Sequence, residues 1–266
     1  MSSRPPITST RNPTLRELRK LHERKHRERS GLFIAEGEDM LAAAIRHDLH
    51  PRTVLYDSTE LSPAAPPLDG MPAEADLVPV TPDALRSIGS LGSGSRLIAV
   101  FEERWRKQAT DVAVYLHEVA DPGNVGAVLR STQALAGGAV LLSPGTADPF
   151  GPKAVRASMG AVFGVPLARA SFHEARAELG DHRAIALVPA QGASLQELQL
   201  PKRILFCLGS ERTGLPEEIV EACDEIAQVP LEPSALESLN VAMTATLCLY
   251  EYAGQHALHR LSSPDA

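Results

Sequence analysis

The sequence predicts an α/β fold in two domains. Residues 1–103 are expected to form a smaller α/β domain, residues 104–111 a charged linker, and residues 112–266 a larger domain with a mostly parallel sheet. Two observations predict this fold: apolar strand-like segments alternate with helical segments through the second half, and three of those strands end in turns rich in glycine and polar side chains. A length of 266 residues suits one large or two medium domains.

The first element is a helix that begins at Asn12-Pro13. Asn is a good N-cap residue, and Pro suits the first helical position because the N–H that it lacks would have no partner within the helix. Leu15, Leu18 and Leu21 form its narrow apolar stripe. Residues 1–29 hold nine Lys/Arg and three Glu, whereas the whole chain has a net charge of −7. The cations therefore predict phosphate contact, or else a solvated helix face. The RNA-binding candidates in this region are Arg11, Arg16, Arg19, Lys20, Arg24, Lys25 and Arg27.

The same predicted helix contains His22, Glu23 and His26 in the zinc-protease pattern H-E-x-x-H. Arg24, Lys25 and other cations surround the two histidines and disfavour a divalent ion, and no third ligand stands out downstream. No metal site is predicted.

The remaining elements follow from apolar runs and turn residues. "GLFIAEG", "TVLYD", "LVPV" and "SRLIAVFE" are expected strands of the first domain, with a helix whose Met40, Leu41, Ala44 and Ile45 point inward and a short helix from Pro82. The second domain is expected to have the strands "VAVYLHEV", "GAVLLS", "AIALV", "RILFCLG" and "EIAQVP", another short strand within "AVFGVPLARA", and helices from Asn124, Pro152, Phe172, Pro216 and Ser238.

The composition places bounds on location and redox chemistry. Hydrophobic residues make up 44% of the chain, and no apolar run reaches the roughly 18 residues of a membrane span. The N-terminal residues lack an apolar signal core, which favours a cytoplasmic protein. The chain has an odd number of cysteines, namely Cys207, Cys223 and Cys248. They form no C-x-x-C pair and lie in or beside apolar segments, so buried, reduced thiols are expected.

The three turns do not match the common nucleotide or hydrolase motifs. No G-x-G-x-x-G is present, Leu215 stands where a phosphate loop would need lysine, and no G-x-S-x-G elbow occurs. In a parallel sheet the turns after strands meet at the carboxyl edge, where ligand crevices form. The three turns are therefore expected to make one site of another kind.

The segments "DPGNVGAVLRST", "LGSERTGL" and "VPLEPSALESLNVAMTATLCLYE" resemble, in order, the three motifs of the SpoU/TrmH family of RNA ribose 2′-O-methyltransferases, members of the SPOUT class. "RNPTLRELRKLHERK" and "GLFIAEG" more loosely resemble the RNA substrate-binding domain fused to many members, an α/β sandwich similar to a small ribosomal protein. The resemblance implies a trefoil knot in the second domain, S-adenosylmethionine as cofactor, no metal, and a homodimer formed through the knotted domains.

The resemblance also implies site residues, carried over by position. The catalytic candidates are Asn124, Arg130, Glu211, Ser238 and Asn240, and the cofactor-binding candidates are Leu208, Gly209, Gly214, Val229, Leu231, Ser238 and Leu239. Lys153 and Arg156 match an RNA-facing family segment, although a structural ion-pair role is equally open. The third motif departs from the family, because seven residues, "LEPSALE", separate Pro230 from Ser238 where six are typical.

Arg130 is the residue expected to contribute most to catalysis. A guanidinium is a poor proton acceptor, so the hypothesis is that Arg130 grips the phosphate beside the target ribose and stabilises the deprotonating hydroxyl, with Ser238 nearby. A helix-surface ion pair is the alternative for Arg130. Glu211 could instead brace backbone amides, and Asn124 and Asn240 could be turn-forming residues.

The favoured function is S-adenosylmethionine-dependent 2′-O-methylation of RNA, with ribosomal RNA preferred over transfer RNA by analogy. Two other classes stay open: an RNA-binding or ribosome assembly factor without turnover, and a nucleotide-dependent reductase on an unknotted sheet. Methyl transfer into RNA distinguishes the first of these from the enzyme, and a panel of cofactors distinguishes the second.

Overall fold

The computed structural model describes residues 4–89, 94–108, 110–232 and 238–256. Contacts within the chain define two compact units, one made of Met1–Arg104 with Asp148–Gly164 and the other of Trp105–Ala147 with Val165–Ala266. The first unit thus includes a segment from the middle of the second half of the sequence. The predicted domain boundaries at 103 and 112 do not assign this segment to the first unit, and they stay a prediction.

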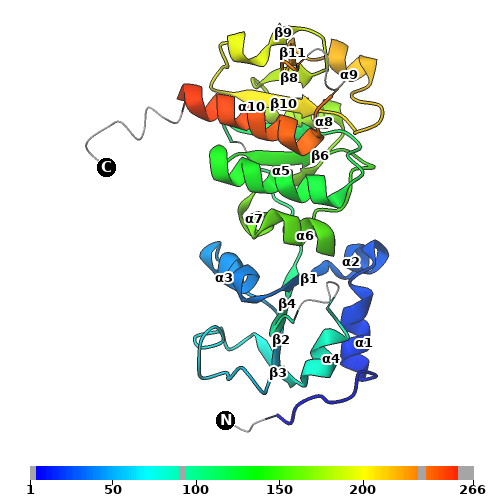
Figure 1. Cartoon of the computed structure of the whole chain (residues 1–266), viewed down its shortest axis with the longest axis vertical. Helices are drawn as coiled ribbons and strands as arrows, with labels where there is room; N and C mark the ends of the chain where they lie inside the picture. The colour runs from blue at the N-terminus through cyan, green and yellow to red at the C-terminus, as the bar shows by residue number, and fades with distance from the viewer. Residues whose placement is uncertain (1–3, 90–93, 109, 233–237, 257–266) are drawn as a thin grey trace, which may run out of the picture. The chain divides into compact units, whose positions relative to one another are not determined.

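The first unit contains a four-stranded mixed sheet in the order β1-β4-β2-β3 (Figure 1). β4 pairs antiparallel with β1 and β2, and β2 pairs parallel with β3. The strands are β1 (Leu32–Glu36), β2 (Thr53–Asp57), β3 (Asp76–Val80) and β4 (Leu97–Glu102), and all four predicted strands are confirmed. The helices are α1 (Pro13–Lys20), α2 (Arg24–Ser30), α3 (Glu38–Arg46), α4 (Pro82–Arg86), α6 (Pro152–Ser158) and α7 (Ala161–Gly164).

The prediction of one continuous N-terminal helix is wrong, because the chain breaks between α1 and α2. Glu23 has an extended backbone with φ −92° and ψ 130°, and α2 starts after it. The guanidinium of Arg27 donates to the carbonyls of Leu21 and His22, which lie at the break and have no helical partner. The imidazole Nε2 of His22 lies 2.6 Å from the carbonyl of Ile88.

This break also separates the two histidines of the H-E-x-x-H pattern. His22 lies outside α2, whereas His26 lies within it, so the two imidazoles do not share one helical face. Within the described residues, no group of three or more His, Cys, Asp or Glu side chains is arranged to hold a metal ion.

The segment Asp148–Gly164 completes the core of the first unit. Phe33 of β1 packs against Phe150 with tilted rings whose centroids are 4.9 Å apart, and Phe101 of β4 packs against Phe163 in the same way at the same separation. Gly160 permits close packing of α7 on α3, because a Cβ added there would lie 2.4 Å from the Cβ of Ala43. Ile45, predicted to face the core from α3, is instead 38% exposed.

The second unit contains a seven-stranded sheet in the order β7-β6-β5-β10-β8-β11-β9, and every pairing in it is parallel. This confirms the predicted mostly parallel sheet. The strands are β5 (Val112–Leu116), β6 (Ala139–Leu142), β7 (Leu167–Arg169), β8 (Arg183–Leu187), β9 (Ala193–Ser194), β10 (Ile204–Leu208) and β11 (Glu225–Gln228). The sequence prediction missed the two-residue strand β9 and the short helix α7.

Helices cover both faces of this sheet. Figure 1 shows α5 (Pro122–Leu135) and α10 (Val241–His256) side by side on one face. The helix α8 (Phe172–Leu179) follows β7, and α9 (Glu217–Glu221) follows the turn after β10. The 3-10 helix η1 (Leu195–Glu197) follows β9. Phe172, Leu179 and Ile219 pack with Tyr115 of β5 and Cys207 of β10 in one buried cluster.

The predicted knot involves residues 229–256, of which 233–237 lie outside the described residues. In the part of the chain that the structure describes, no helix combines the length and apolarity needed to cross a membrane.

Candidate active site

Three turns at the carboxyl edge of the parallel sheet are joined by a chain of side-chain hydrogen bonds. Asn240 Nδ2, just before α10, donates to Asn124 Oδ1 at 3.0 Å, and Asn124 Nδ2 in α5 donates to Glu211 Oε1 at 2.6 Å. The backbone N–H of Ala120 donates to the second oxygen of Glu211 at 3.3 Å. Residues 116 and 87 positions apart therefore meet at one place, as the predicted convergence of the three turns requires.

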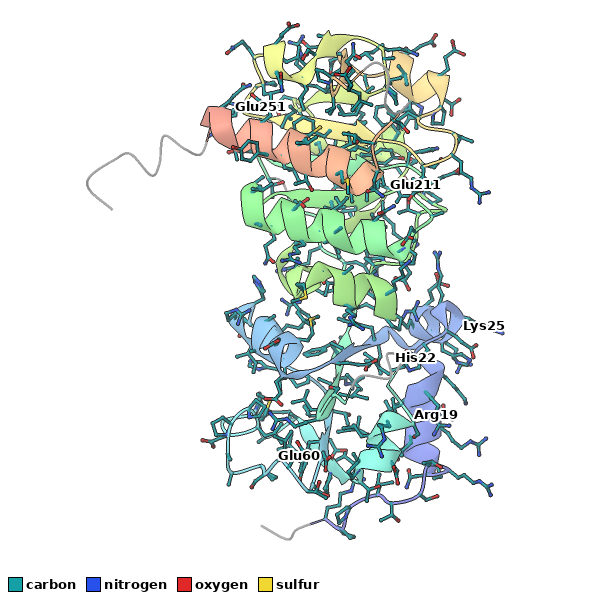
Figure 2. The ribbon with its side chains drawn as sticks, in the orientation of Figure 1. Arg19, His22, Lys25, Glu60, Glu211 and Glu251 are labelled. Carbon is teal, nitrogen blue, oxygen red and sulfur yellow. The ribbon has the colours of Figure 1, made fainter. Side chains whose placement is uncertain are left out.

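Local sequence explains how each turn presents its residue. Asp121 caps α5 by accepting from the N–H of Gly123 at 2.6 Å, and Pro122 occupies the first helical position. Asn240 caps α10 through Oδ1, which accepts from the N–H of Ala242 at 2.8 Å, so its amide nitrogen is left to face Asn124. Figure 2 shows Glu211 at the N-terminal end of α10.

A cavity of about 480 Å³ lies beside this chain of hydrogen bonds. It is lined by Glu211 and by the turns that follow β8, β10 and β11, together with the start of α10. All the residues predicted to bind the cofactor line it: Leu208, Gly209, Gly214, Val229, Leu231, Ser238 and Leu239. The geometry gathers these residues, and their contact with a cofactor stays a proposal.

The cavity fits a nucleoside-containing cofactor such as S-adenosylmethionine. Its volume lies in the usual range of roughly 300–1,000 Å³ for small-molecule sites. Gly209 lets the turn after β10 fold tightly, because a Cβ there would lie 2.0 Å from the backbone carbon of Gly214. Leu208 and Val229 supply apolar surface for a ring, while Gln228 and Ser238 supply hydrogen-bonding groups.

The predicted catalytic residues are only partly gathered. Glu211 and Ser238 line the cavity, and Asn124 and Asn240 join it through the hydrogen bonds described above. Arg130 is exposed on α5, and within the described ranges it forms no hydrogen bond or ion pair with the other four. Arg130 is not among the residues that line the cavity.

Sequence reasoning missed the contribution of the turn after β8. Leu187, Val188, Pro189 and Gln191 line the cavity from that turn, and Arg212 and Thr213 line it beside Glu211. The sequence signal was present, because "ALVPAQG" is a buried strand that ends in proline and glycine. β8 lies next to β10 in the sheet, so its carboxyl end reaches the same cavity.

The predicted RNA-binding cations fall into three groups. Arg11, Arg16, Arg24 and Lys25 are exposed, Arg19 and Lys20 are half-buried, and Lys153 and Arg156 are exposed on α6. Figure 2 shows Arg19 and Lys25 on α1 and α2. Arg27 is only 4% exposed, and its guanidinium is bonded to Asp148 and to two backbone carbonyls. A buried, fully bonded guanidinium cannot contact phosphate, so Arg27 leaves the set of RNA-binding candidates.

Two of the three thiols differ from the third in their environment. Burial raises the pKa of Cys207 and of Cys248. Cys223 is half-buried, contrary to the expectation of a buried thiol, and a hydrogen bond from Cys207 lowers its pKa. Burial likewise raises the pKa of Tyr115, which packs near Cys207, to about 12.

A parallel sheet with a cofactor-sized cavity at the carboxyl ends of its strands is typical of α/β proteins that bind a cofactor. Within that class, residues 111–250 match the SpoU rRNA Methylase family, and residues 12–99 match the MRM3-like substrate binding domain. The chain therefore belongs to the SpoU rRNA methylase family. This confirms the family and the fold predicted from the three motifs.

Two curated relatives cover nearly the whole chain. The 23S rRNA (guanosine(2553)-2′-O)-methyltransferase RlmP of Bacillus subtilis is 30% identical over 93% of this chain and 99% of its own length. The 23S rRNA (uridine(2479)-2′-O)-methyltransferase of Streptomyces viridochromogenes is 28% identical over 91% of this chain and 90% of its own.

Solved structures agree with this grouping. The AdoMet-bound rRNA methyltransferase from Sinorhizobium meliloti superposes with a TM-score of 0.82 at 26% identity, covering 95% of this chain and 98% of that one. The SpoU methyltransferase AviRb from Streptomyces viridochromogenes in complex with AdoMet gives a TM-score of 0.81 at 27% identity, covering 95% of this chain and all of that one.

Proposed function

We propose that this protein is an S-adenosylmethionine-dependent methyltransferase that modifies a ribose 2′-hydroxyl in ribosomal RNA. The observation that carries the proposal is the Asn240–Asn124–Glu211 hydrogen-bond chain beside the cavity of about 480 Å³. Relatives that span nearly the whole chain carry this activity on 23S rRNA in their names, which favours ribosomal over transfer RNA. A cytoplasmic location belongs to the same proposal, because the relatives named above are methyltransferases of ribosomal RNA.

The cofactor supplies a methyl group on a positively charged sulfur, which is already activated toward attack. The protein's task is to place the ribose hydroxyl in line and to assist loss of its proton. Placement alone can supply ~7–11 kcal/mol of the barrier. Glu211 and Asn240 fix the amide of Asn124 from both sides, so its orientation is set before substrate arrives. Ser238, in the cavity lining, offers a hydroxyl for hydrogen bonding.

Arg130 is proposed to hold the phosphate beside the target ribose. Its guanidinium is exposed and has no ion-pair partner among the described residues, so it is available to an incoming anion. Positive charge there favours the negative charge that develops on the attacking oxygen. The proton leaves to phosphate or water, because arginine is too basic to accept it.

The cations of the first unit are proposed to position the RNA. Arg11, Arg16 and Lys25 are exposed and make no ion pair with another described residue, whereas Arg24 pairs with Glu28 at 2.7 Å. The match of residues 12–99 to a substrate-binding domain supports this role. The sequence division into residues 1–103 for RNA binding, 104–111 as linker and 112–266 for methyl transfer belongs to the same proposal.

A homodimer through the second unit is also proposed. Met243, Leu247 and Tyr250 are 61%, 40% and 66% exposed, and their spacing along α10 places them on one face. An apolar stripe of this kind on a surface helix favours a partner. Sedimentation of wild type as a dimer and of Leu247→Glu/Tyr250→Glu as a monomer would support the proposal, whereas a monomeric wild type would exclude it.

The test is transfer of tritium from methyl-labelled S-adenosylmethionine into ribosomal RNA. Arg130→Ala is expected to bind the cofactor normally and to lower the transfer rate by about 100-fold, as loss of an electrostatic stabiliser does. A near-normal rate for Arg130→Ala would refute its role. Cofactor binding without transfer into any RNA would favour a non-catalytic assembly factor, and stabilisation by nicotinamide dinucleotide alone would favour a reductase.

A further inference from the structure

A second cavity, of about 370 Å³, lies wholly within the first unit. The residues that line the proposed cofactor cavity all belong to the other unit, so the two cavities share no lining residue. The second cavity lies between the β1–α3 turn and α6, with a small contribution from the chain before β4. Its lining residues are Ile34, Glu36, Gly37, Asp39, Met40, Gly94, Ser95, Pro152, Val155, Arg156 and Met159.

The floor of this cavity is apolar and its position is fixed by packing. Ile34, Met40 and Val155 are 3%, 7% and 2% exposed. Met159 is 56% exposed and belongs to the cavity lining, and a flexible thioether of this kind adapts to a flat ligand. The buried Arg27–Asp148 pair and the Gly160–Ala43 contact hold α6 and α7 against the sheet, so both walls exist before any ligand arrives.

Two charged groups of opposite sign line the same cavity. Glu36, at the end of β1, presents a carboxylate, which accepts hydrogen bonds from N–H groups. Arg156 is exposed and has no ion-pair partner in the described part of the chain, so its guanidinium is available to an anion. Asp39 is exposed at the start of α3, which disfavours phosphate on that side and leaves the Arg156 side for it.

A nucleotide has the features that this cavity matches. Its base is flat, with apolar faces and N–H donors on its edge, and the adjoining phosphate is an anion. Sequence-specific proteins recognise single-stranded RNA by contacting the faces of unstacked bases and by hydrogen bonding to their edges. The cavity combines residues of the matched substrate-binding domain, 12–99, with residues of α6 from the methylase match, 111–250.

We propose that this cavity receives one unstacked nucleobase of the RNA substrate. The base lies on Ile34, Met40 and Val155, Glu36 accepts from its edge, and Arg156 binds the neighbouring phosphate. Capture of a base here fixes the register of the RNA on the first unit. The proposal rests on the proposed function, since it supplies that reaction with a means of selecting its substrate.

Photo-crosslinking of the full-length protein tests the location directly. The probes are two 23S rRNA transcripts, one with 4-thiouridine and one with 6-thioguanosine in place of part of the normal nucleotide, irradiated with the protein and analysed by mass spectrometry of the crosslinked peptides. Crosslinks to peptides that contain Met40, Val155 or Met159 with at least one transcript are the expected result. Crosslinks confined to peptides outside the cavity overturn the proposal.

Variants test the same site through affinity for the unsubstituted transcript. Arg156→Ala and Met159→Glu are each expected to raise the Kd for RNA by about tenfold, as loss of a phosphate contact or added negative charge does. Arg46→Ala and Ile45→Glu, at exposed positions of α3 outside the cavity lining, are matched controls and should change the Kd less than twofold. An unchanged urea unfolding transition shows that each variant is folded, and equal effects in variants and controls overturn the proposal.

Methyl transfer by the wild-type protein, measured on the same transcripts, separates this proposal from the proposed function. Crosslinks in the cavity without methyl transfer would remove the proposed function and leave the base-binding site standing. Methyl transfer without crosslinks in the cavity, and with normal RNA affinity of Arg156→Ala, would remove the base-binding site alone.

Discussion

Arg27 of α2 and Asp148, 121 positions later in the sequence, form a buried ion pair in which Nη2 lies 2.7 Å from Oδ2. Both side chains are less than 10% exposed, at 4% and 7%. The same guanidinium donates to the carbonyls at the break between α1 and α2. One side chain therefore supplies donors to the backbone at the end of α1 and a cationic partner to the first residue of the segment Asp148–Gly164.

Replacing Arg27 by methionine should therefore destabilise the protein by about 3–5 kcal/mol, because the buried carboxylate of Asp148 loses its cationic partner. Urea unfolding measures the change. The matched control is Arg24→Met, which removes an exposed pair with Glu28 and should cost less than about 1 kcal/mol. Normal stability of Arg27→Met together with weakened RNA binding would show that Arg27 is a phosphate contact after all.

Gly160→Ala should destabilise the first unit through the packing of α7 on α3. The added Cβ would lie 2.4 Å from the Cβ of Ala43, and the backbone φ of +95° is itself unfavourable for alanine. We expect a loss of about 2–4 kcal/mol in free energy of unfolding, in the range of overpacking and backbone strain combined. Gly180→Ala has a positive φ of +60° with open space around it, and it isolates the strain contribution. Equal losses in the two variants would argue against the close contact.

Glu211→Ala should disorganise the hydrogen-bond chain at the proposed active site. Asn124 and the N–H of Ala120 lose their shared acceptor, and hydrogen bonds to a charged group are worth about 1.5–3 kcal/mol each. Methyl transfer is therefore expected to fall by about 10- to 100-fold. Glu218→Ala, on the exposed side of α9, is the control and should retain wild-type activity. Full activity of Glu211→Ala would show that methyl transfer does not need Glu211.

Only one of the three thiols should react rapidly with Ellman's reagent in the native protein. The hydrogen bond from Cys207 lowers the pKa of Cys223, so its thiolate forms at lower pH than in a free cysteine. Burial raises the pKa of Cys207 and Cys248 and keeps both protonated. The fast phase should disappear in Cys223→Ser. In the wild-type protein, the rate of the fast phase should rise with pH and level off at a pH below that typical of free thiols. A fast phase that survives this substitution would assign the reactive thiol elsewhere.

The parts of the fold that local sequence determines were predictable. β2 and β10 are apolar runs bounded by turn residues, and each forms the strand that its pattern indicates. The break between α1 and α2 was not predictable, because it depends on Arg27 bonding to Asp148, a residue distant in sequence. Likewise, the exposure of Ile45 is set by how α3 packs rather than by its apolar side chain.

The site was predictable where the three motifs carried it. The three motifs contain Asn124, Glu211 and Asn240, and hydrogen bonds join these three residues in the structure. The turn after β8 was missed because its role depends on the neighbouring position of β8 and β10, which strand order along the chain does not reveal. The role of Arg130 remains a prediction, since its side chain is exposed and forms no ion pair with another described residue.

The chemical position of the transferred methyl group tests the central claim most directly. Ribosomal RNA labelled by the protein with tritiated S-adenosylmethionine is hydrolysed in alkali, which cleaves the chain through free 2′-hydroxyls and leaves a 2′-O-methylated nucleotide joined to its 3′ neighbour. Ribose methylation predicts that the tritium appears in alkali-resistant dinucleotides, at a rate about 100-fold higher for wild type than for Arg130→Ala. Tritium in mononucleotides, or none in RNA despite bound cofactor, would contradict the account.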